Sequence, residues 1–283
     1  MIQDKETNIV YLSENLSKWK DYKDFSENLE DLLKKLEISY EWISDTKDIW
    51  ARDYMPIQLE ENDFLKYKYE PDYLRKSKSK TDCTEACSKI GIKYRETDLI
   101  IDGGNVVLCG DKVVMTGKVF TENNKEKGDK SFLKELKDLF KHEVIIIPWH
   151  ATGKPDDKDA DFYGHSDGFI KYCGDNRILM SNHRDYDEDE AIQIRQELEK
   201  NHFEVTEMLF NVDYPQYDLN WAYINFLQVG NNIIIPKFGI AEDEQAKRYV
   251  QNAFPYCRLR QIDCRAIAKK GGALHCVSWN IKK

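Results

Sequence analysis

An internal repeat constrains the fold of this chain more than any other feature of its sequence. Three segments each contain two runs of mostly β-branched and apolar residues, joined by a Gly that is followed by Asp or Asn: residues 105–115, 168–180 and 223–236. Gly and Asn tolerate the positive φ angles of tight hairpin turns. We therefore expect three β-hairpins with turns at Gly110, Gly174 and Gly230.

Each predicted hairpin is followed by a candidate helix and then by one more strand. The helices are expected at residues 131–141, 188–200 and 243–253. The strands that follow them are expected at residues 144–148, 203–209 and 258–262. An earlier copy of the unit is indicated by a hairpin at 57–69, a helix at 84–90 and a strand at 98–101. A helix at 25–36 and the C-terminal run 273–281 would complete a fifth copy between the two ends of the chain.

Units of this size are too small to bury separate cores. Repeated around an axis, they can share a core, with the ends of the units converging on one central site. The chain of 283 residues is 41% hydrophobic and has no linker rich in Pro, Gly or Ser. We therefore predict a single α/β domain over residues 1–283. The Lys-rich stretch 66–80 is expected to be an exposed loop of this domain.

Composition limits the partners and the location that we expect. Acidic residues outnumber basic ones by 51 to 42, and the net charge of −9 disfavours nucleic acid and anionic membranes. We expect neither a signal peptide nor a membrane span. The seven cysteines, an odd number, indicate reduced thiols in a cytoplasm. Cys83 and Cys87 lack a second pair at matching spacing, so we expect two thiols on a surface helix rather than a zinc site. For the assembly of the chain, a homodimer is one of the possibilities.

Four short segments at the ends of the repeated units carry reactive side chains: 50–53, 102–105, 164–168 and 271–276. Together they supply a thiol, an imidazole and several carboxylates. A thiolate is a strong nucleophile, and an imidazole can move protons for it. Nearby carboxylates raise the pKa of a thiol, so the set suits a substrate that is itself a cation. A guanidinium fits this requirement, because its planar N–H donors match carboxylate oxygens and leave the central carbon open to sulfur.

The segments WARDYMP, DGGNVV, GHSDGF, YINF and GGALHC occur in this order between Ile49 and the C-terminus. In this combination the chain resembles the guanidine-modifying superfamily, the penteins, and within it the agmatine deiminase and bacterial-type peptidylarginine deiminase family. The resemblance implies a five-bladed, pseudo-symmetric α/β propeller of ββαβ units. It also implies a small cationic guanidino substrate and no requirement for a metal or an organic cofactor.

The resemblance assigns roles to individual residues of this chain. Cys276 matches the nucleophile of the family, and His165 matches its general acid and base. Asp53 and Asp167 match the carboxylates that bind guanidinium. Asn225 matches a polar residue near the substrate.

Four further residues are singled out beside these. Asp102 stands where many relatives carry a Glu that orients the histidine, and its side chain is shorter by one methylene group. Trp50 and Trp279 are candidates either for the wall of the pocket or for the core. His275 is expected to be structural, because in an extended segment its side chain points away from that of its neighbour.

The implied reaction is hydrolytic deimination through a covalent thiouronium on Cys276, and agmatine is the first expectation, giving N-carbamoylputrescine and ammonia. Peptidyl-arginine as the substrate and amidino transfer to an amine are alternatives that keep the site. A non-catalytic binding protein of the same fold is another alternative. The last is a metal hydrolase that uses His165 with neighbouring acids: Asp156, Asp157, Asp161 and Asp167.

Overall fold

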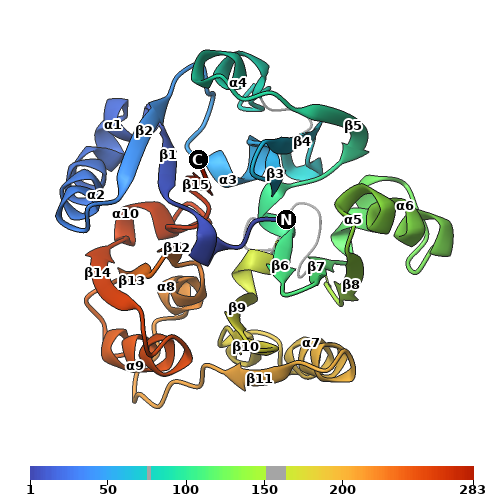
Figure 1. Cartoon of the computed structure of the whole chain (residues 1–283). Coiled ribbons are helices and arrows are strands. Elements are labelled where there is room, and N and C mark those ends of the chain that lie inside the picture. Colours follow the sequence, from blue (N-terminus) through green and yellow to red (C-terminus); the bar gives the residue numbers. More distant parts are fainter. Residues whose placement is uncertain (75–77, 151–163) are drawn as a thin grey trace.

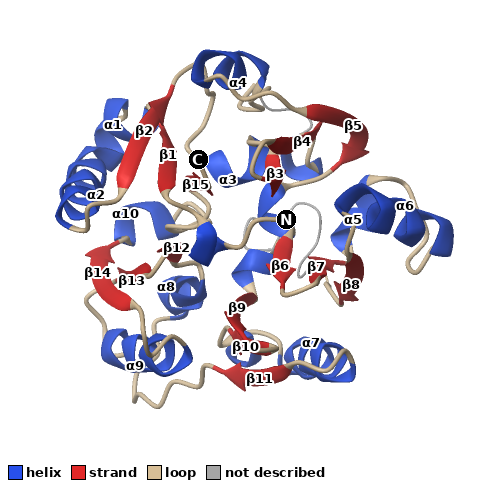
Figure 2. Ribbon diagram, viewed as in Figure 1, coloured by secondary structure: helices blue, strands red, loops and turns tan. Residues whose placement is uncertain are grey.

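The computed structural model describes residues 1–74, 78–150 and 164–283. In this part of the chain, five three-stranded sheets surround a central axis, and the longer helices lie on the outside (Figure 1). Figure 2 shows the first strand of each unit near the axis and the main helix at the periphery. The predicted five-bladed α/β propeller is therefore confirmed.

The five sheets, or blades, share one internal order of strands. In order of pairing, the strands are β3 (Ile57–Glu60), β4 (Asp63–Lys68) and β5 (Arg95–Ile100); β6 (Val107–Cys109), β7 (Lys112–Thr116) and β8 (Glu143–Ile147); β9 (Ile170–Gly174), β10 (Arg177–Met180) and β11 (Glu204–Glu207); β12 (Leu227–Val229), β13 (Asn232–Lys237) and β14 (Arg258–Asp263); and β15 (Ser278–Ile281), β1 (Ile9–Ser13) and β2 (Ser39–Ile43). In every blade the first pair is antiparallel and the second pair is parallel. A tight hairpin can join the first pair, whereas the parallel pair needs a crossover helix.

One main helix makes this crossover in each blade: α4 (Thr84–Ile90), α6 (Lys130–Phe140), α7 (Glu188–Lys200), α9 (Asp243–Ala253) and α2 (Lys23–Lys35). Shorter helices are α1 (Asn15–Lys18), α3 (Ala51–Tyr54), α5 (Lys118–Glu122), α8 (Tyr217–Asn220) and α10 (Arg265–Ala268). On α6, Phe132, Leu136 and Phe140 are buried, and their spacing of four residues places them on one face. The predicted helices at 84–90, 188–200 and 243–253 are confirmed.

The fifth blade is closed by the two ends of the chain. β15 pairs with β1 in antiparallel register, so that Ile9 lies opposite Ile281. The predicted helix at 25–36 corresponds to α2, and the run 273–281 supplies only the four residues of β15, because residues 273–277 form turns. Strands β1 and β2 were not predicted from the sequence.

Two expectations about surface segments are wrong. The Lys-rich stretch 66–80 is not wholly a loop, because β4 continues to Lys68 with Tyr67 buried. Cys83 and Cys87 are buried rather than on a surface. Their spacing of four residues places them on the side of α4 that faces the core, where they belong to the same apolar cluster as Tyr54.

A short turn precedes the first strand of every blade: α3, the 3-10 turns Gly103–Asn105, Ser166–Gly168 and Trp221–Ile224, and the turn at 273–277. Since the blades are related by rotation, these five axial turns meet near the centre of the propeller. Each of the four reactive segments found in the sequence contains one of them or runs into it. Within the described ranges, no helix is long and apolar enough to cross a membrane.

Candidate active site

The axial turns are tied to one another by hydrogen bonds that backbone N–H groups donate. The N–H of Arg52 donates to the carbonyl of Cys276 at 3.1 Å. The N–H of Gly104 donates to Asp53 Oδ1 at 3.2 Å. These bonds hold the reactive side chains of different blades in a fixed relation. All five acidic, imidazole and thiol side chains predicted for the site are buried there: Asp53, Asp102, His165, Asp167 and Cys276.

His165 lies between two carboxylates. Its Nε2 donates to Asp102 Oδ2 at 2.8 Å, and its Nδ1 lies 3.5 Å from Asp53 Oδ1. The shorter side chain of Asp102 therefore reaches the histidine. Burial opposes the charged ring, but Asp53 and the hydrogen bond to Asp102 outweigh it and raise the pKa of His165 to about 9. The imidazole is therefore protonated at neutral pH.

A buried cation lies behind Asp102. Lys118 Nζ is 3.2 Å from the same Asp102 oxygen that His165 contacts, and it also pairs with Glu122 at 2.7 Å and Asp72 at 3.3 Å. Burial alone would raise the pKa of Asp102, but Lys118 and the hydrogen bond from His165 lower it below its usual value. Asp102 is thus held as a carboxylate. Lys118 was not predicted from the sequence, because nothing local marks a lysine that pairs across the fold.

Asp167 is the acceptor of three groups. Its Oδ2 lies 2.6 Å from His275 Nδ1, accepts from Asn225 Nδ2 at 3.2 Å, and accepts from the Cys276 thiol at 3.8 Å. Burial would raise the pKa of Asp167, but His275 and the charge of His165 lower it. Asp167 is therefore an ionised carboxylate next to the thiol.

Asn225 holds the turn that carries the thiol. Its Oδ1 accepts from the backbone N–H of Ala273 at 3.1 Å and from that of Cys276 at 3.2 Å. Its Nδ2 meanwhile donates to Asp167. Asn225 thus fixes the position of Cys276 relative to Asp167.

The environment of Asp53 and Cys276 opposes the ionisation of both side chains. Burial raises the pKa of Asp53 to about 7, and the neighbouring carboxylates add to this effect. Burial, Asp167 and Asp53 together raise the pKa of Cys276 well above its usual value. A bound cation would relieve both groups, because it would offset the carboxylates that oppose their ionisation.

Gly104 borders the space between these groups. A Cβ atom there would lie 2.7 Å from Asp53 Oδ1, 2.7 Å from His165 Nδ1 and 3.2 Å from Asp167 Oδ1. A side chain at this position would therefore displace at least one of them. The absence of a side chain brings the backbone of one blade against the charged groups of two others.

The two tryptophans differ in environment. Trp50 packs against Gly272, where a Cβ would lie only 2.3 Å from the ring, so Trp50 supports the turn before Cys276. Trp279 is buried in the core, and its Nε1 donates to the carbonyl of Pro56 at 2.8 Å. Trp279 is thus a core residue rather than a wall of the site.

The reason given for a structural His275, that its side chain points away from that of its neighbour, does not hold. It assumed an extended segment, but residues 273–277 form turns, so neighbouring side chains do not alternate between two faces. His275 Nδ1 instead contacts Asp167, the carboxylate beside the thiol.

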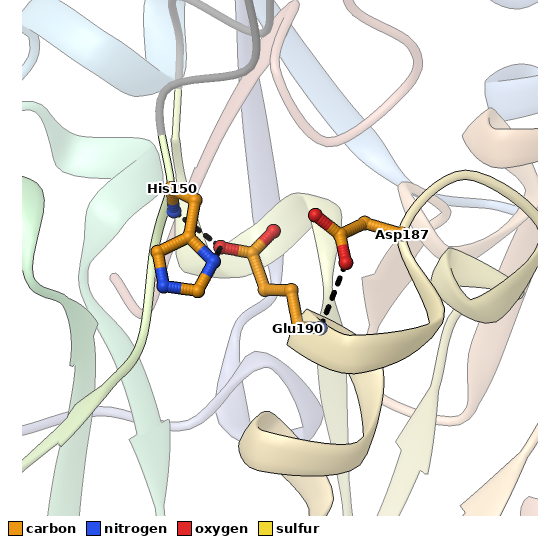
Figure 3. A group of neighbouring side chains, drawn as sticks. All are labelled: His150, Asp187 and Glu190. Atoms are coloured by element: carbon orange, nitrogen blue, oxygen red, sulfur yellow. Dashed lines mark hydrogen bonds and ion pairs between the residues drawn. The ribbon is translucent and has the colours of Figure 1, made fainter.

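A second cluster of polar side chains lies at the start of α7. Figure 3 shows His150, Asp187 and Glu190 facing one another. His150 Nδ1 lies 3.5 Å from Glu190 Oε1, and His183 Nε2 lies 2.7 Å from Glu190 Oε2. Asp187 caps the helix by accepting from the Glu190 N–H at 2.8 Å. The positive end of a helix dipole favours carboxylates and disfavours a metal cation, so we describe this cluster as a helix cap with two histidines beside Glu190.

Only two of the five residues of the metal-hydrolase alternative lie in the described part of the chain. Asp156, Asp157 and Asp161 lie outside the described residues. The two described members, His165 and Asp167, both belong to the axial site, where their contacts are with Asp102, Asp53 and other side chains of that site.

A five-bladed α/β propeller of ββαβ units, with a thiol, an imidazole and carboxylates on its axis, defines a pentein. The chain belongs to the Porphyromonas-type peptidyl-arginine deiminase family, which it matches over residues 3–281. The family resemblance of the sequence motifs is thereby confirmed.

Individual relatives agree with this placement. Agmatine deiminase from Pseudomonas aeruginosa (strain LESB58) is 24% identical over 218 residues, which cover 66% of this chain and 58% of the relative. The matched region is thus less than two thirds of the length of that relative. Among solved structures, Campylobacter jejuni agmatine deiminase superimposes with a TM-score of 0.76 at 20% identity, covering 100% of this chain and 95% of that one. DDAH from P. aeruginosa gives a TM-score of 0.60 at 11% identity, with 97% and 99% covered. At these identities the likeness concerns the fold.

Proposed function

We propose that this chain hydrolyses a guanidino compound to the corresponding ureido compound and ammonia, with Cys276 as the nucleophile. The observation that carries the proposal is that Asp53, His165 and Asp167 surround Gly104 while the Cys276 thiol contacts Asp167. Asp53 and Asp167 both border the Cβ position of Gly104, and His165 lies beside them. A guanidinium placed there would supply a positive charge and pair with both carboxylates.

Binding of the cation prepares the nucleophile. The pKa of the Cys276 thiol is raised by burial and by Asp167 and Asp53. A guanidinium paired with these two carboxylates offsets their charge and so lowers the pKa of the thiol. The thiolate therefore forms when substrate is present, and its proton passes to solvent.

The first step breaks a C–N bond. The Cys276 thiolate adds to the central carbon, giving a tetrahedral adduct. His165, protonated because its pKa is raised to about 9, donates a proton to one amino group, which leaves as ammonia. A positively charged thiouronium remains on sulfur, and Asp53 and Asp167 stabilise its charge.

The second step restores the thiol. His165, now neutral, takes a proton from water, and the hydroxide adds to the same carbon. Collapse of this adduct expels the Cys276 thiolate, which takes up the proton of the added hydroxyl to restore the thiol, and leaves a urea group on the substrate. Asp102 holds the ring of His165 through both steps by accepting from Nε2.

Agmatine is the first candidate for the substrate, and the products are then N-carbamoylputrescine and ammonia. It is favoured by the curated relatives, several of which are named agmatine deiminases. Peptidyl-arginine is the second candidate, favoured by the description of the family that matches nearly the whole chain. Both candidates present the same guanidinium to the site and differ in what is attached to it.

A substrate panel tests the proposal. Agmatine, arginine, guanidinobutyrate and an arginine-containing peptide are assayed for ammonia and for ureido product, with and without an added amine to detect amidino transfer. We expect Cys276→Ala to abolish product formation. Cys257→Ala is the control, because Cys257 is a free and partly exposed thiol that lies outside the axial turns. Equal loss in both variants, or full activity in Cys276→Ala, refutes the assignment of the nucleophile.

A further inference from the structure

His275 connects the site to the N-terminal end of the chain. On one side its Nδ1 lies 2.6 Å from Asp167 Oδ2. On the other side its Nε2 lies 3.6 Å from Asp4 Oδ2. Asp4 belongs to a 3-10 turn at Asp4–Glu6, which comes before the first strand of the propeller. The imidazole thus stands between a carboxylate of the site and one contributed by the N-terminus.

Asp4 is the carboxylate on which the cations behind the site converge. Its Oδ2 pairs with Lys171 at 3.2 Å, and its Oδ1 accepts from Asn280 Nδ2 at 3.1 Å. Burial opposes its ionisation, but Lys171 and Arg52 outweigh that effect and hold the pKa of Asp4 well below its usual value. Asp4 is therefore ionised, and it offsets the charge of a lysine whose side chain is only 6% exposed.

A cavity of about 350 Å³ adjoins this group. It is lined by the N-terminal residues and by three cationic or imidazole side chains of the axial region: Arg52, Lys171 and His275. Asp4 enters it from the N-terminal turn and provides the anion that these side chains face. The cavity thus already holds its own counter-charge, supplied by the chain itself.

His275 is neutral in this setting. Burial, Arg52 and Lys171 lower its pKa to about 4. Because Asp167 is ionised, the short contact at Nδ1 requires the ring proton to be on that nitrogen. His275 therefore acts as a fixed hydrogen-bond donor to Asp167 and does not carry protons for the reaction.

We propose that His275 and Asp4 are positioning residues for the guanidinium carboxylate Asp167: His275 by donating to it, and Asp4 by holding Lys171 away from it. This inference rests on the proposed function, in which Asp167 pairs with the substrate. The N-terminal turn, which carries Asp4, thereby helps to keep Asp167 in position. Without Asp4, Asp167 is a carboxylate whose charge still acts on Lys171, because it already raises the pKa of that lysine. Lys171 would then compete with the substrate cation.

The first experiment removes the charge of Asp4. Asp4→Asn is compared with Asp175→Asn, which takes one negative charge from the same cavity but lies in an exposed turn away from His275. The readouts are KM and kcat for the best guanidine substrate. A second readout is the concentration of guanidinium chloride that half-protects Cys276 from iodoacetamide. We expect Asp4→Asn to raise KM and the half-protecting concentration by about ten-fold, with a smaller change in kcat. Asp175→Asn should stay within about two-fold of the parent.

The second experiment separates positioning from packing at His275. Asparagine can place an N–H donor near the position of Nδ1, whereas alanine cannot. We expect His275→Ala to raise the half-protecting concentration by about 10- to 100-fold, and His275→Asn to restore most of the loss. The fraction of protein that iodoacetamide labels at Cys276 corrects each value for misfolded molecules.

Three results overturn the inference. These are an Asp4→Asn variant that behaves like Asp175→Asn, a His275→Asn variant as impaired as His275→Ala, and a loss of active fraction with KM and protection unchanged. The protection assay needs no turnover. If the parent protein converts no guanidine, the proposed function fails, yet the protection values of the variants still decide whether Asp4 and His275 position Asp167.

Discussion

Adding one methyl group at Gly104 is the smallest change that tests the geometry of the axial site. In Gly104→Ala the new Cβ would lie 2.7 Å from both Asp53 Oδ1 and His165 Nδ1, where contacts of 3.4 Å or more are ordinary. At least one of these groups must therefore move by about 0.7 Å. Since a displacement of about 1 Å in a catalytic group can cost about 100-fold in rate, we expect kcat/KM to fall by about 10- to 100-fold.

The same variant should fold normally. Gly104 has no positive φ, so alanine can adopt its backbone conformation without strain. Gly117→Ala is the control, because Gly117 has a φ of −60° and its nearest non-neighbouring atoms would be 3.9 Å from a Cβ. Deiminase kinetics and thermal unfolding are measured for both variants. Full activity in Gly104→Ala, or an equal loss in Gly117→Ala, would refute the reasoning.

Three further predictions follow from other contacts. Lys118→Met leaves Asp102 and Glu122 without their buried cation, so the free energy of unfolding measured in urea should fall by about 3–5 kcal/mol. Adding Glu122→Gln should recover part of this loss. A loss below about 1 kcal/mol contradicts the prediction. Burial raises the pKa of Asp53 to about 7 in the folded chain, against about 3.9 when unfolded, so folding favours the protonated form and stability is lost as pH rises between these values. Asp53→Asn should therefore melt higher than the parent above pH 7 while binding guanidinium less well, and a lower melting temperature there refutes the argument. Trp279→Phe removes the hydrogen bond to Pro56 and should cost about 1–2 kcal/mol of stability with kcat/KM unchanged; an altered KM would place Trp279 at the substrate.

The repeat was readable because its signals are local. A Gly turn between two apolar runs predicts a hairpin, and the start of α7 is marked by Asp187, whose side chain accepts from the Glu190 N–H as a helix cap. The predicted helix at 188–200 matches the observed bounds for this reason. The fifth blade was harder, because its strands come from both ends of the chain. The pairing of Ile9 with Ile281 has no local signal in the sequence.

Only the site residues that lie within the sequence motifs could be predicted. Cys276, His165, Asp53 and Asp167 lie in recognisable segments and do meet at the axis. The contact of His275 was missed because the turn at 273–277 was taken for an extended strand. The role of Lys118 could not be predicted, because its contact with Asp102 exists only in the folded chain.

Asp4 was not predicted from the sequence either, because its contacts also form only in the folded chain. It belongs to no motif, and the partners of its side chain, Asn280, Lys171 and His275, are distant in the sequence. Burial of charged groups is a property of the fold, since a lysine in a strand such as β9 is ordinarily expected to face solvent. The supporting groups around a site are therefore harder to predict than the reacting groups.

Detection of the covalent intermediate tests the central claim most directly. The protein is mixed with agmatine, or with the best substrate of the panel, quenched in acid during turnover, digested and analysed by mass spectrometry. We predict that the peptide containing Cys276 gains the mass of the substrate less one ammonia. An adduct on another cysteine, or ureido product formed by Cys276→Ala at the parental rate, would contradict attack of Cys276 on the guanidinium carbon.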